Sequence, residues 1–280
     1  MKYDSATSLH VNHVPGNAPG LHGFASDMVQ GLRPHAPHAD VELALDSPRA
    51  NRLLAALPAP DYERLAPHLE QVNFAFGVSP FRCGRHITHG YFPTTCIVSR
   101  RYLMENGAAV TFAIIGREGL VGIPLLMGGE ASPFQMVVQR AGTAYRIRAE
   151  TLKQEFDRGG ALQYLLLRYM QALSTQMGQG AVCNGHHTIE KRMCRWLLLS
   201  LDRMNSNELC MTQQQIAETL GVRRESVTEA EKKLQDSGLI ERHRGQIEVK
   251  DRVALEARVC ECYEVETGEF ERLLPACVAA

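Results

Sequence analysis

The spacing of apolar positions divides the chain into helical and β-rich stretches. Between 51 and 69, leucines recur at helical spacing, and Pro58-Ala-Pro60 predicts a break into two short helices, the second capped near Asp61. From 72 to about 148, short β-rich runs alternate with glycine-containing turns, which is typical of an antiparallel barrel or roll of roughly 75 residues. The predicted strands are 95–99, 108–115, 135–139 and 143–147.

Helical periodicity returns from 151 to about 183. Five positions there alternate spacings of four and three, as in a helix that packs on an identical helix of a second chain. This predicted dimerisation seam is Leu162, Leu166, Tyr169, Leu173 and Gln176. Packing on the chain's own roll is the alternative, and further apolar residues widen the face enough for both contacts. Gly178, Gly180 and Gly185 weaken the helix and predict a hinge.

Residues 212–238 carry the most specific pattern in the chain. Thr212-Gln-Gln-Gln215 is a capping box, which predicts the first turn of a helix. Leu220-Gly-Val222 then predicts a tight turn, because glycine accommodates the left-handed backbone of a sharp helix–helix corner. A second helix begins at Arg223 or Arg224 and ends at Ser237-Gly238, a C-terminal glycine signal.

The spacing within this segment is that of a helix-turn-helix. With Gln213 as the first position, Ala217, Gly221 and Val227 fall at the fifth, ninth and fifteenth. These positions require a small residue, a positive φ and an apolar plug. The other buried positions are filled by Ile216, Leu220, Val222 and Ala230. An ordinary αα-hairpin is the alternative, but it does not account for all these matches together with the capping box.

A hairpin wing is predicted next, because Leu239-Ile-Glu-Arg242 and Gln246-Ile-Glu-Val249 alternate apolar and polar residues around His243-Arg-Gly245. Its tip, with Arg242, His243 and Arg244, is expected to meet phosphate. The exposed face of the second helix is expected to read bases in the major groove. The predicted DNA-contacting residues are Thr212, Gln214, Arg223, Arg224, Glu225, Thr228, Glu229, Lys232, Arg242 and Arg244. A merely solvated helix face is the alternative, which we assign to Glu231 and Asp236.

Charge adds little to this interpretation. The formal net charge is −1, from 30 Lys+Arg and 31 Asp+Glu, so the overall balance gives no support to a nucleic-acid partner. Between 212 and 250 there are seven charges of each sign. DNA affinity would therefore depend on a few well-placed cations and on dimer avidity.

The composition, 45% hydrophobic and 22% charged, is typical of a folded protein, and 280 residues suffice for two domains. Residues 1–44 differ, because they lack apolar periodicity and are predicted to be a disordered tail. The tail contains five histidines, which raises the alternative of metal binding. A solvated tail is favoured, since no pair of these histidines has the helical context of a ligand site. Without a secretory signal or a long apolar run, we expect a cytoplasmic protein whose cysteines stay reduced.

The eight cysteines predict no metal site. Only Cys260-x-Cys262 is a tight pair, and this pattern alone is a weak metal or redox signal, so small buried hydrophobes are the favoured interpretation. His186-His187, after Cys183, suggests Cys/His chemistry or haem ligation, but a flexible polar linker is favoured.

No enzyme is predicted either. The sequence has no phosphate loop, no G-x-S-x-G, no H-E-x-x-H and no pair of CxxC motifs at zinc spacing. A pure ligand-binding module would leave the helix-turn-helix spacing unexplained.

The order of a β-roll, a long seam helix, a hinge and a winged helix-turn-helix resembles the cyclic-AMP receptor protein/FNR (Crp/Fnr) family of bacterial transcription regulators. The resemblance covers about 50–256 and is most specific in Ile216-Ala-Glu-Thr-Leu-Gly-Val-Arg-Arg-Glu-Ser-Val227 and in the wing. It implies a homodimer that reads a two-fold symmetric operator, with Arg224 and Glu225 at base-reading positions.

Two departures from the family pattern change the expected ligands. At Glu229 the best-known members carry an arginine that reads a guanine, so we expect a different operator. In the roll, Gly119-Leu-Val-Gly122-Ile123-Pro124 has isoleucine where the ribose-binding glutamate belongs, and Ser132-Pro133-Phe134 stands near the place of the phosphate-binding arginine. An anionic ligand would lose its charge-assisted hydrogen bonds there. We therefore expect no cyclic AMP in the usual mode, no cofactor, and an effector that is unidentified or absent.

Together these patterns predict an α+β protein with a cyclic-nucleotide-binding-like β-roll, a long dimerisation helix and a C-terminal winged helix-turn-helix. The predicted function is a homodimeric transcription regulator of the Crp/Fnr type that binds double-stranded promoter DNA, with RNA polymerase as a partner and no membrane contact. The alternative is an effector-binding sensor, or a haem- or redox-responsive module, whose DNA contacts are secondary. The predicted divisions are 1–44 (tail), 45–158 (roll), 159–186 (dimerisation helix and hinge), 187–253 (winged domain) and 254–280 (helical extension).

Overall fold

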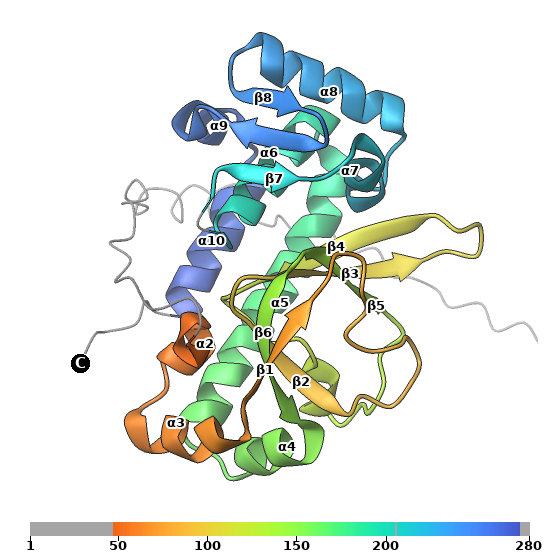
Figure 1. The fold of residues 1–280 in the computed structure, drawn as a ribbon. Coiled ribbons are helices and arrows are strands. Elements are labelled where there is room, and N and C mark those ends of the chain that lie inside the picture. The colour runs from red at the N-terminus through yellow and green to blue at the C-terminus, as the bar shows by residue number, and fades with distance from the viewer. Residues whose placement is uncertain (1–46, 205, 275–280) are drawn as a thin grey trace, which may run out of the picture. The chain divides into compact units, whose positions relative to one another are not determined.

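The computed structural model describes residues 47–204 and 206–274, so the predicted tail at 1–44 lies outside the described residues. The chain forms a β-roll, one long helix beside it, a winged-helix domain and two C-terminal helices (Figure 1). Among the described residues, no helix is both long enough and apolar enough to cross a membrane.

Short helices precede the roll: η1 (Pro48–Ala50), α2 (Arg52–Ala55), α3 (Ala59–Leu65) and η2 (Ala66–His68). Asn51 begins α2, because its side-chain oxygen accepts hydrogen bonds from the N–H groups of Leu53 and Leu54. The stretch is divided into two helices, as predicted, but the break lies at 56–58. However, α3 begins at Ala59 rather than near Asp61, since proline is tolerated within a first helical turn.

Six antiparallel strands build the roll, as two three-stranded sheets with the orders β1–β6–β2 and β4–β3–β5. They are β1 (Glu70–Phe74), β2 (His89–Pro93), β3 (Ile97–Leu103), β4 (Ala109–Ile115), β5 (Gln135–Arg140) and β6 (Gly142–Arg148). The last four match predicted strands. The first two were missed, because β1 is largely exposed and polar and β2 contains a glycine and a proline, which are depleted in strands.

The roll and the long helix share one hydrophobic core, to which Phe92, Ile115 and Leu120 contribute from the roll. After η3 (Ile123–Leu125) and α4 (Ala149–Asp157), the long helix α5 (Ala161–His186) lies along the roll. It continues through all three glycines that predicted a hinge. Gly180 is buried against β4, and a Cβ there would lie 3.4 Å from the Phe112 carbonyl oxygen.

The backbone changes direction at His187, which is extended and ends α5. The winged-helix domain follows. It comprises α6 (Ile189–Leu201), β7 (Glu208–Cys210), α7 (Gln213–Leu220), α8 (Arg224–Asp236), β8 (Ile240–His243) and β9 (Gln246–Val249). The three strands form an antiparallel sheet in the order β7–β9–β8.

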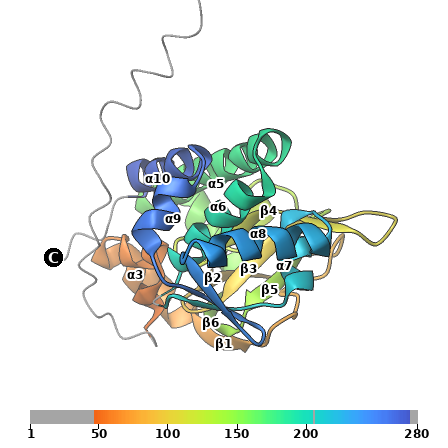
Figure 2. The ribbon, with the colours of Figure 1, turned by 90° about the horizontal axis from the view of Figure 1, so that it is seen from above.

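Two helices follow the wing, α9 (Arg252–Arg258) and α10 (Cys262–Leu273). Leu255 and Tyr263 belong to the core of the winged-helix domain. Farther along, α10 runs beside α5, where Phe270 and Leu273 join the core of the roll (Figures 1 and 2). The C-terminal extension therefore connects both halves of the molecule.

Candidate nucleic-acid interface

The first helix of the predicted helix-turn-helix begins with the predicted capping box. The Thr212 hydroxyl accepts a hydrogen bond from the Gln215 N–H at 3.3 Å, and Gln215 Oε1 accepts one from the Thr212 N–H at 2.7 Å. At the other end, Gly221 has a φ of 63°, so the left-handed turn that requires glycine is present. The Val222 N–H donates to the Ala217 carbonyl and closes the corner between α7 and α8.

The buried positions of the helix-turn-helix form the core of the winged-helix domain. Ile216, Ala217 and Val227 are buried between the helices, and Leu234 fixes the other end of α8. This packing settles which face of α8 points outward. The DNA-contacting residues predicted at this helix are all exposed, namely Arg223, Arg224, Glu225, Thr228, Glu229 and Lys232.

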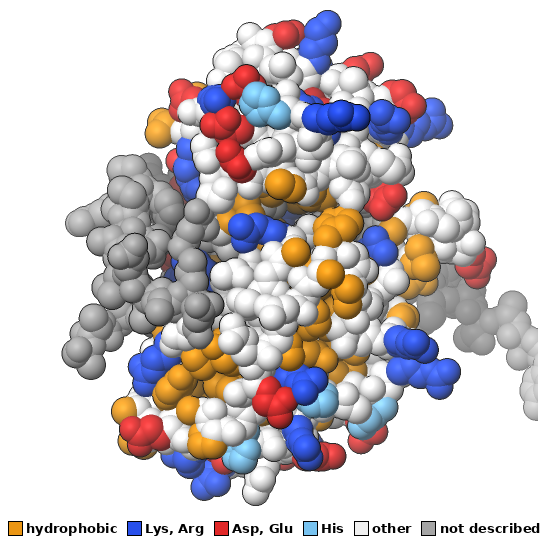
Figure 3. Space-filling model, in the orientation of Figure 1, with side chains coloured by type: hydrophobic (Ala, Val, Ile, Leu, Met, Phe, Trp, Pro, Cys, Tyr) orange, Lys and Arg blue, Asp and Glu red, His pale blue; other side chains and the backbone are white. Residues whose placement is uncertain are grey.

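The N-terminal end of α8 is cationic, with Arg223 as the residue that precedes the helix and Arg224 as its first residue. In the space-filling view, Lys and Arg side chains lie along the upper edge of the molecule, where α7 and α8 are, with acidic side chains between them (Figure 3). The Thr228 hydroxyl donates to the Arg224 carbonyl at 3.1 Å, so it is already engaged by the helix backbone. Gln214, exposed on α7, donates to Glu218 at 3.1 Å.

The structure corrects the assignments of Arg242 and Glu231. Arg242 lies within β8, is ion-paired with Glu231, and donates to the Met211 carbonyl at 3.3 Å. Glu231 is buried rather than solvated and also accepts from Gln213 Nε2 at 2.7 Å. Burial raises the pKa of the Glu231 carboxyl. Arg242 therefore stabilises the domain from within and is not free at the tip of the wing.

The wing turns at Arg244 and Gly245, one residue later than expected, and Gly245 has a φ of 77°. Arg244 is exposed there. His243 is the last residue of β8 and has two acidic neighbours, Glu241 at 3.6 Å and Glu248 at 4.0 Å. Arg244 is thus the cation of the predicted tip that remains available to a phosphate.

A buried ion pair connects the winged-helix domain to the roll. Arg203, which follows α6, donates from Nε to Glu118 Oε1 of the roll at 2.8 Å, and both side chains are buried. Glu118 Oε1 also accepts from the Gly116 N–H at 3.0 Å. The sequence provided no signal for this pair, because its members lie 85 positions apart.

The same network continues into α5 and α10. Arg203 lies 3.7 Å from Glu266 of α10, and Arg195 of α6 pairs with Glu266 at 2.5 Å. Gln176 of α5 donates to Glu266 at 2.6 Å and accepts from the Ile114 N–H of β4 at 3.2 Å. One buried polar network therefore joins the roll, the long helix, the winged-helix domain and the C-terminal extension.

The first helix of the helix-turn-helix also contacts the roll directly. Gln139 of β5 donates to the Thr219 hydroxyl of α7 at 3.0 Å. Val110 of β4 lies close to Gly221, where a Cβ would be 3.1 Å from its side chain. The position of α7 is therefore set by the roll, whereas the exposed face of α8 is not covered by it.

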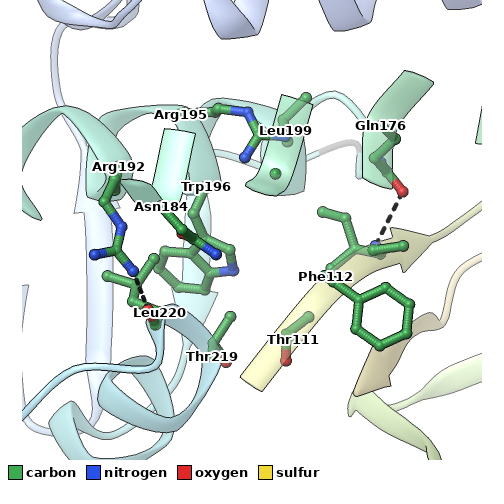
Figure 4. A pocket seen from close by; sticks show the side chains of 13 residues that line it. Thr111, Phe112, Gln176, Asn184, Arg192, Arg195, Trp196, Leu199, Thr219 and Leu220 are labelled. Atoms are coloured by element: carbon green, nitrogen blue, oxygen red, sulfur yellow. Dashed lines mark hydrogen bonds between the residues drawn. The ribbon is translucent and has the colours of Figure 1, made fainter. Parts of the chain in front are cut away.

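A hollow lies at this junction, bounded by β4, α5, α6 and α7 (Figure 4). Arg192 donates to the Leu220 carbonyl at its edge. Among the described residues, no hydrogen-bond partner is within reach of Arg192 Nε, Arg195 Nε or Trp196 Nε1. The junction thus has spare hydrogen-bond donors next to the turn of the helix-turn-helix.

The five residues of the predicted dimerisation seam are all buried within the single chain. Leu162, Leu166 and Leu173 pack in the core of the roll, the Tyr169 ring meets Phe270 of α10, and Gln176 joins the buried network. Their assignment to a dimer interface does not fit this arrangement, because α10 and the roll already cover that face.

Phe134, from the segment compared with the family's phosphate-binding arginine, lies in a partly buried cluster with Arg100 and Phe112. Arg100 lies over the ring of Phe134 at 4.5 Å and near that of Phe112 at 5.4 Å, and burial lowers the pKa of its guanidinium. Gly119 is backed by Tyr169 of α5, and Ser132 is buried. Arg100 was not predicted from the sequence as a residue of this cluster. It lies within β3 and belongs to no recognisable motif.

Four side chains that were interpreted separately from the sequence, as buried hydrophobes and as part of a linker, lie close together at the end of α5. Cys183, His187, Cys260 and Cys262 place their ligand atoms within 4.8 Å of one another. The three thiols are buried, as the interpretation as small buried hydrophobes predicted. The flexible linker predicted at His186-His187 is wrong, because α5 continues through His186 and the His187 side chain is mostly covered.

A helix-turn-helix with a hairpin wing, held on a β-roll by a long helix, defines a class of DNA-binding regulators. The family model of the Crp-like helix-turn-helix domain matches residues 191–258. No curated protein matches the chain in sequence.

Solved structures of Crp/Fnr regulators share the fold. FixK2 from Bradyrhizobium japonicum is 16% identical with a TM-score of 0.59, over 69% of this chain and 98% of that one. The c-di-GMP-responsive global regulator CLP of Xanthomonas campestris is 17% identical with a TM-score of 0.55, over 69% and 100%. A transcriptional regulator of the CRP family from Thermus thermophilus is 18% identical with a TM-score of 0.56, over 67% and 95%.

The chain therefore has the fold of the Crp/Fnr transcription regulators and carries their helix-turn-helix domain. This confirms both the resemblance and the fold class predicted from the sequence.

Proposed function

We propose that the protein is a sequence-specific transcription regulator that binds promoter DNA as a homodimer on a two-fold symmetric operator. The observation that carries this proposal is the exposed, cationic N-terminal end of α8, with Arg223 and Arg224 projecting from a rigid helix-turn-helix. Arginine at this place can donate two hydrogen bonds to a guanine in the major groove. Exposed Arg244 of the wing is placed to add a phosphate contact.

The proposed dimer face is the exposed side of α5. Tyr164, Leu167, Gln171, Ser174 and Gly178 are all exposed there and repeat at spacings of three and four. Tyr164 is 63% exposed and Leu167 50% exposed, which is unusual for large apolar side chains on a helix otherwise buried on two sides. A second copy of the same helix would cover them by coiled-coil packing. The occupant is therefore a second copy of this chain.

The proposed operator differs from the familiar one of the family. Glu229 is exposed on the reading face, where its carboxylate can accept a hydrogen bond from a cytosine amino group but repels phosphate. We expect RNA polymerase as a further partner and no catalytic activity. Cyclic AMP is not expected to raise the melting temperature, since the roll offers it Ile123 and Ser132 in place of a glutamate and an arginine.

Selection of bound DNA from a random pool tests the proposal. The expected result is an enriched site with two-fold symmetry and half-sites about one helical turn apart. Sedimentation of the complex between the protein and this DNA site measures whether two chains bind to it. Enrichment of no sequence above the input pool would contradict sequence-specific regulation and would favour the alternative of a sensor module.

A further inference from the structure

The four side chains at the C-terminal end of α5 are brought together from two distant parts of the chain. Cys183 and His187 lie one helical turn apart, so both project from the same side of the helix end. Cys260 and Glu261 lie between α9 and α10, and Cys262 is the first residue of α10. The three thiols are buried and His187 is mostly covered, so they form a small enclosed cluster.

The distances within the cluster fit one tetrahedral metal ion. Zinc–sulfur bonds of about 2.3 Å place two sulfurs about 3.8 Å apart, and a zinc–nitrogen bond of about 2.0–2.1 Å places sulfur and nitrogen about 3.6 Å apart. Here the Sγ atoms of Cys183 and Cys260 are 3.6 Å apart. Cys262 Sγ is 3.5 Å from His187 Nδ1. All four ligand atoms lie within 4.8 Å of one another.

The second nitrogen of His187 provides an independent observation. Its Nε2 lies 3.3 Å from Glu261 Oε1, while Nδ1 faces the thiols. Metal-binding histidines commonly donate their other N–H to a carboxylate, which fixes the tautomer and makes the ligand nitrogen more basic. Glu261 is in the right place to hold the imidazole with Nδ1 turned toward the cluster.

We propose that Cys183, His187, Cys260 and Cys262 form a structural zinc site. Three thiolates and one imidazole are a common ligand set for structural zinc. Each thiol releases its proton to solvent when it binds the ion. An iron–sulfur cluster is disfavoured, because its ligands surround several atoms and lie farther apart than the donors of a single ion.

The site would fasten the C-terminal extension to the long helix. It joins the end of α5, immediately before the chain turns into α6, to the connection after α9 and the first residue of α10. Since α10 covers the inner face of α5 and carries Glu266, zinc at this point would hold the buried network in place. The proposed role is independent of DNA recognition, because none of the four residues lies on the exposed face of α8.

Metal analysis of the full chain, purified without a histidine tag, tests the site. We expect about one zinc per chain, falling to background in the double variant Cys260→Ser/Cys262→Ser. The control is Cys210→Ser, which removes an exposed thiol outside the cluster and should keep the zinc. Because all variants share the N-terminal histidines, the difference between them reports on the cluster alone.

Ligand exchange at His187 separates coordination from folding. His187→Cys should retain the metal with four sulfurs, whereas His187→Ala should lose it. Cobalt substitution should give the visible bands of a tetrahedral thiolate site in the wild type and shift them in His187→Cys. Glu261→Gln should weaken zinc affinity about 10- to 100-fold in chelator competition, because the imidazole loses its orienting carboxylate.

Three results would overturn the proposal. The first is equal zinc content in the wild type and the double serine variant. The second is bound iron with sulfide in the wild type in place of zinc. The third is that the metal-free wild type contains a Cys183–Cys260 disulfide and, after this bond is reduced, the protein still does not bind cobalt. If the serine variant fails to fold, the cobalt spectrum of the wild type still decides the question.

Discussion

Arg203 of the winged-helix domain donates a hydrogen bond to Glu118 of the roll at 2.8 Å, and both side chains are buried. Breaking a buried pair by removing one partner leaves an uncompensated charge, which costs about 3–5 kcal/mol of unfolding free energy. We expect Glu118→Leu to destabilise the protein by that order in chemical denaturation. The double variant Glu118→Leu/Arg203→Met should recover part of the loss. A Glu118→Leu variant as stable as the wild type would show that the pair contributes nothing.

Arg224 should read one base position. Arg224→Ala should lower affinity for the selected site by about 1–3 kcal/mol, mainly by relaxing preference at that position, with the thermal melting of the free protein unchanged. Titration of labelled DNA carrying each base at each position measures this. An equal loss on all sequences would instead assign Arg224 to a phosphate contact.

Arg242 and Arg244, two residues apart in the wing, should behave oppositely. Arg242→Ala should lower the melting temperature, because Glu231 would be left buried without its cation. Arg244→Ala should leave melting unchanged and reduce the salt dependence of DNA binding by about one phosphate contact. If Arg244→Ala bound DNA with the wild-type affinity and salt slope, the wing would not be in contact with phosphate.

Leu166 and Leu167 form a matched pair on α5, because Leu166 is fully buried and Leu167 is half exposed. Leu167→Glu should give a folded monomer in sedimentation, since it places a charge in the proposed dimer face. Leu166→Glu should unfold the chain, since the charge would enter the core of the roll. A dimeric Leu167→Glu protein would place the interface elsewhere.

Cys96 should make the protein sensitive to alkali. Burial raises the pKa of its thiol from 9.0 to about 12, so the unfolded chain loses this proton more readily than the folded one. The resulting stabilisation is complete below about pH 9 and is lost as the pH rises toward 12.

In that range the wild type should lose up to about 1.4 kcal/mol per pH unit relative to Cys96→Ala. Denaturation of both proteins at several pH values measures the difference, and parallel pH profiles would show that the Cys96 thiol does not contribute. Since only the difference in slope matters, the small cavity left by alanine does not affect the comparison.

The helix-turn-helix was predictable from the sequence because its determinants are local. The capping box at Thr212 and the positive φ at Gly221 depend on residues within a few positions, and the spacing of Ala217 and Val227 follows from helix geometry. Two roll strands escaped prediction for a related reason: the polar residues of β1 and the Gly and Pro of β2 carry no local β signal, and pairing with β6 makes them strands.

The sequence by itself therefore determined the class of protein, its winged helix-turn-helix and the absence of the usual cyclic-nucleotide residues. Only the tertiary structure decided what covers each apolar or reactive face. Periodicity showed that Leu166 and Tyr169 share one side of a helix, but not that α10 returns to cover it. Likewise, Cys183 and Cys260 become neighbours only because the chain folds back over 77 positions, a contact that no local pattern encodes.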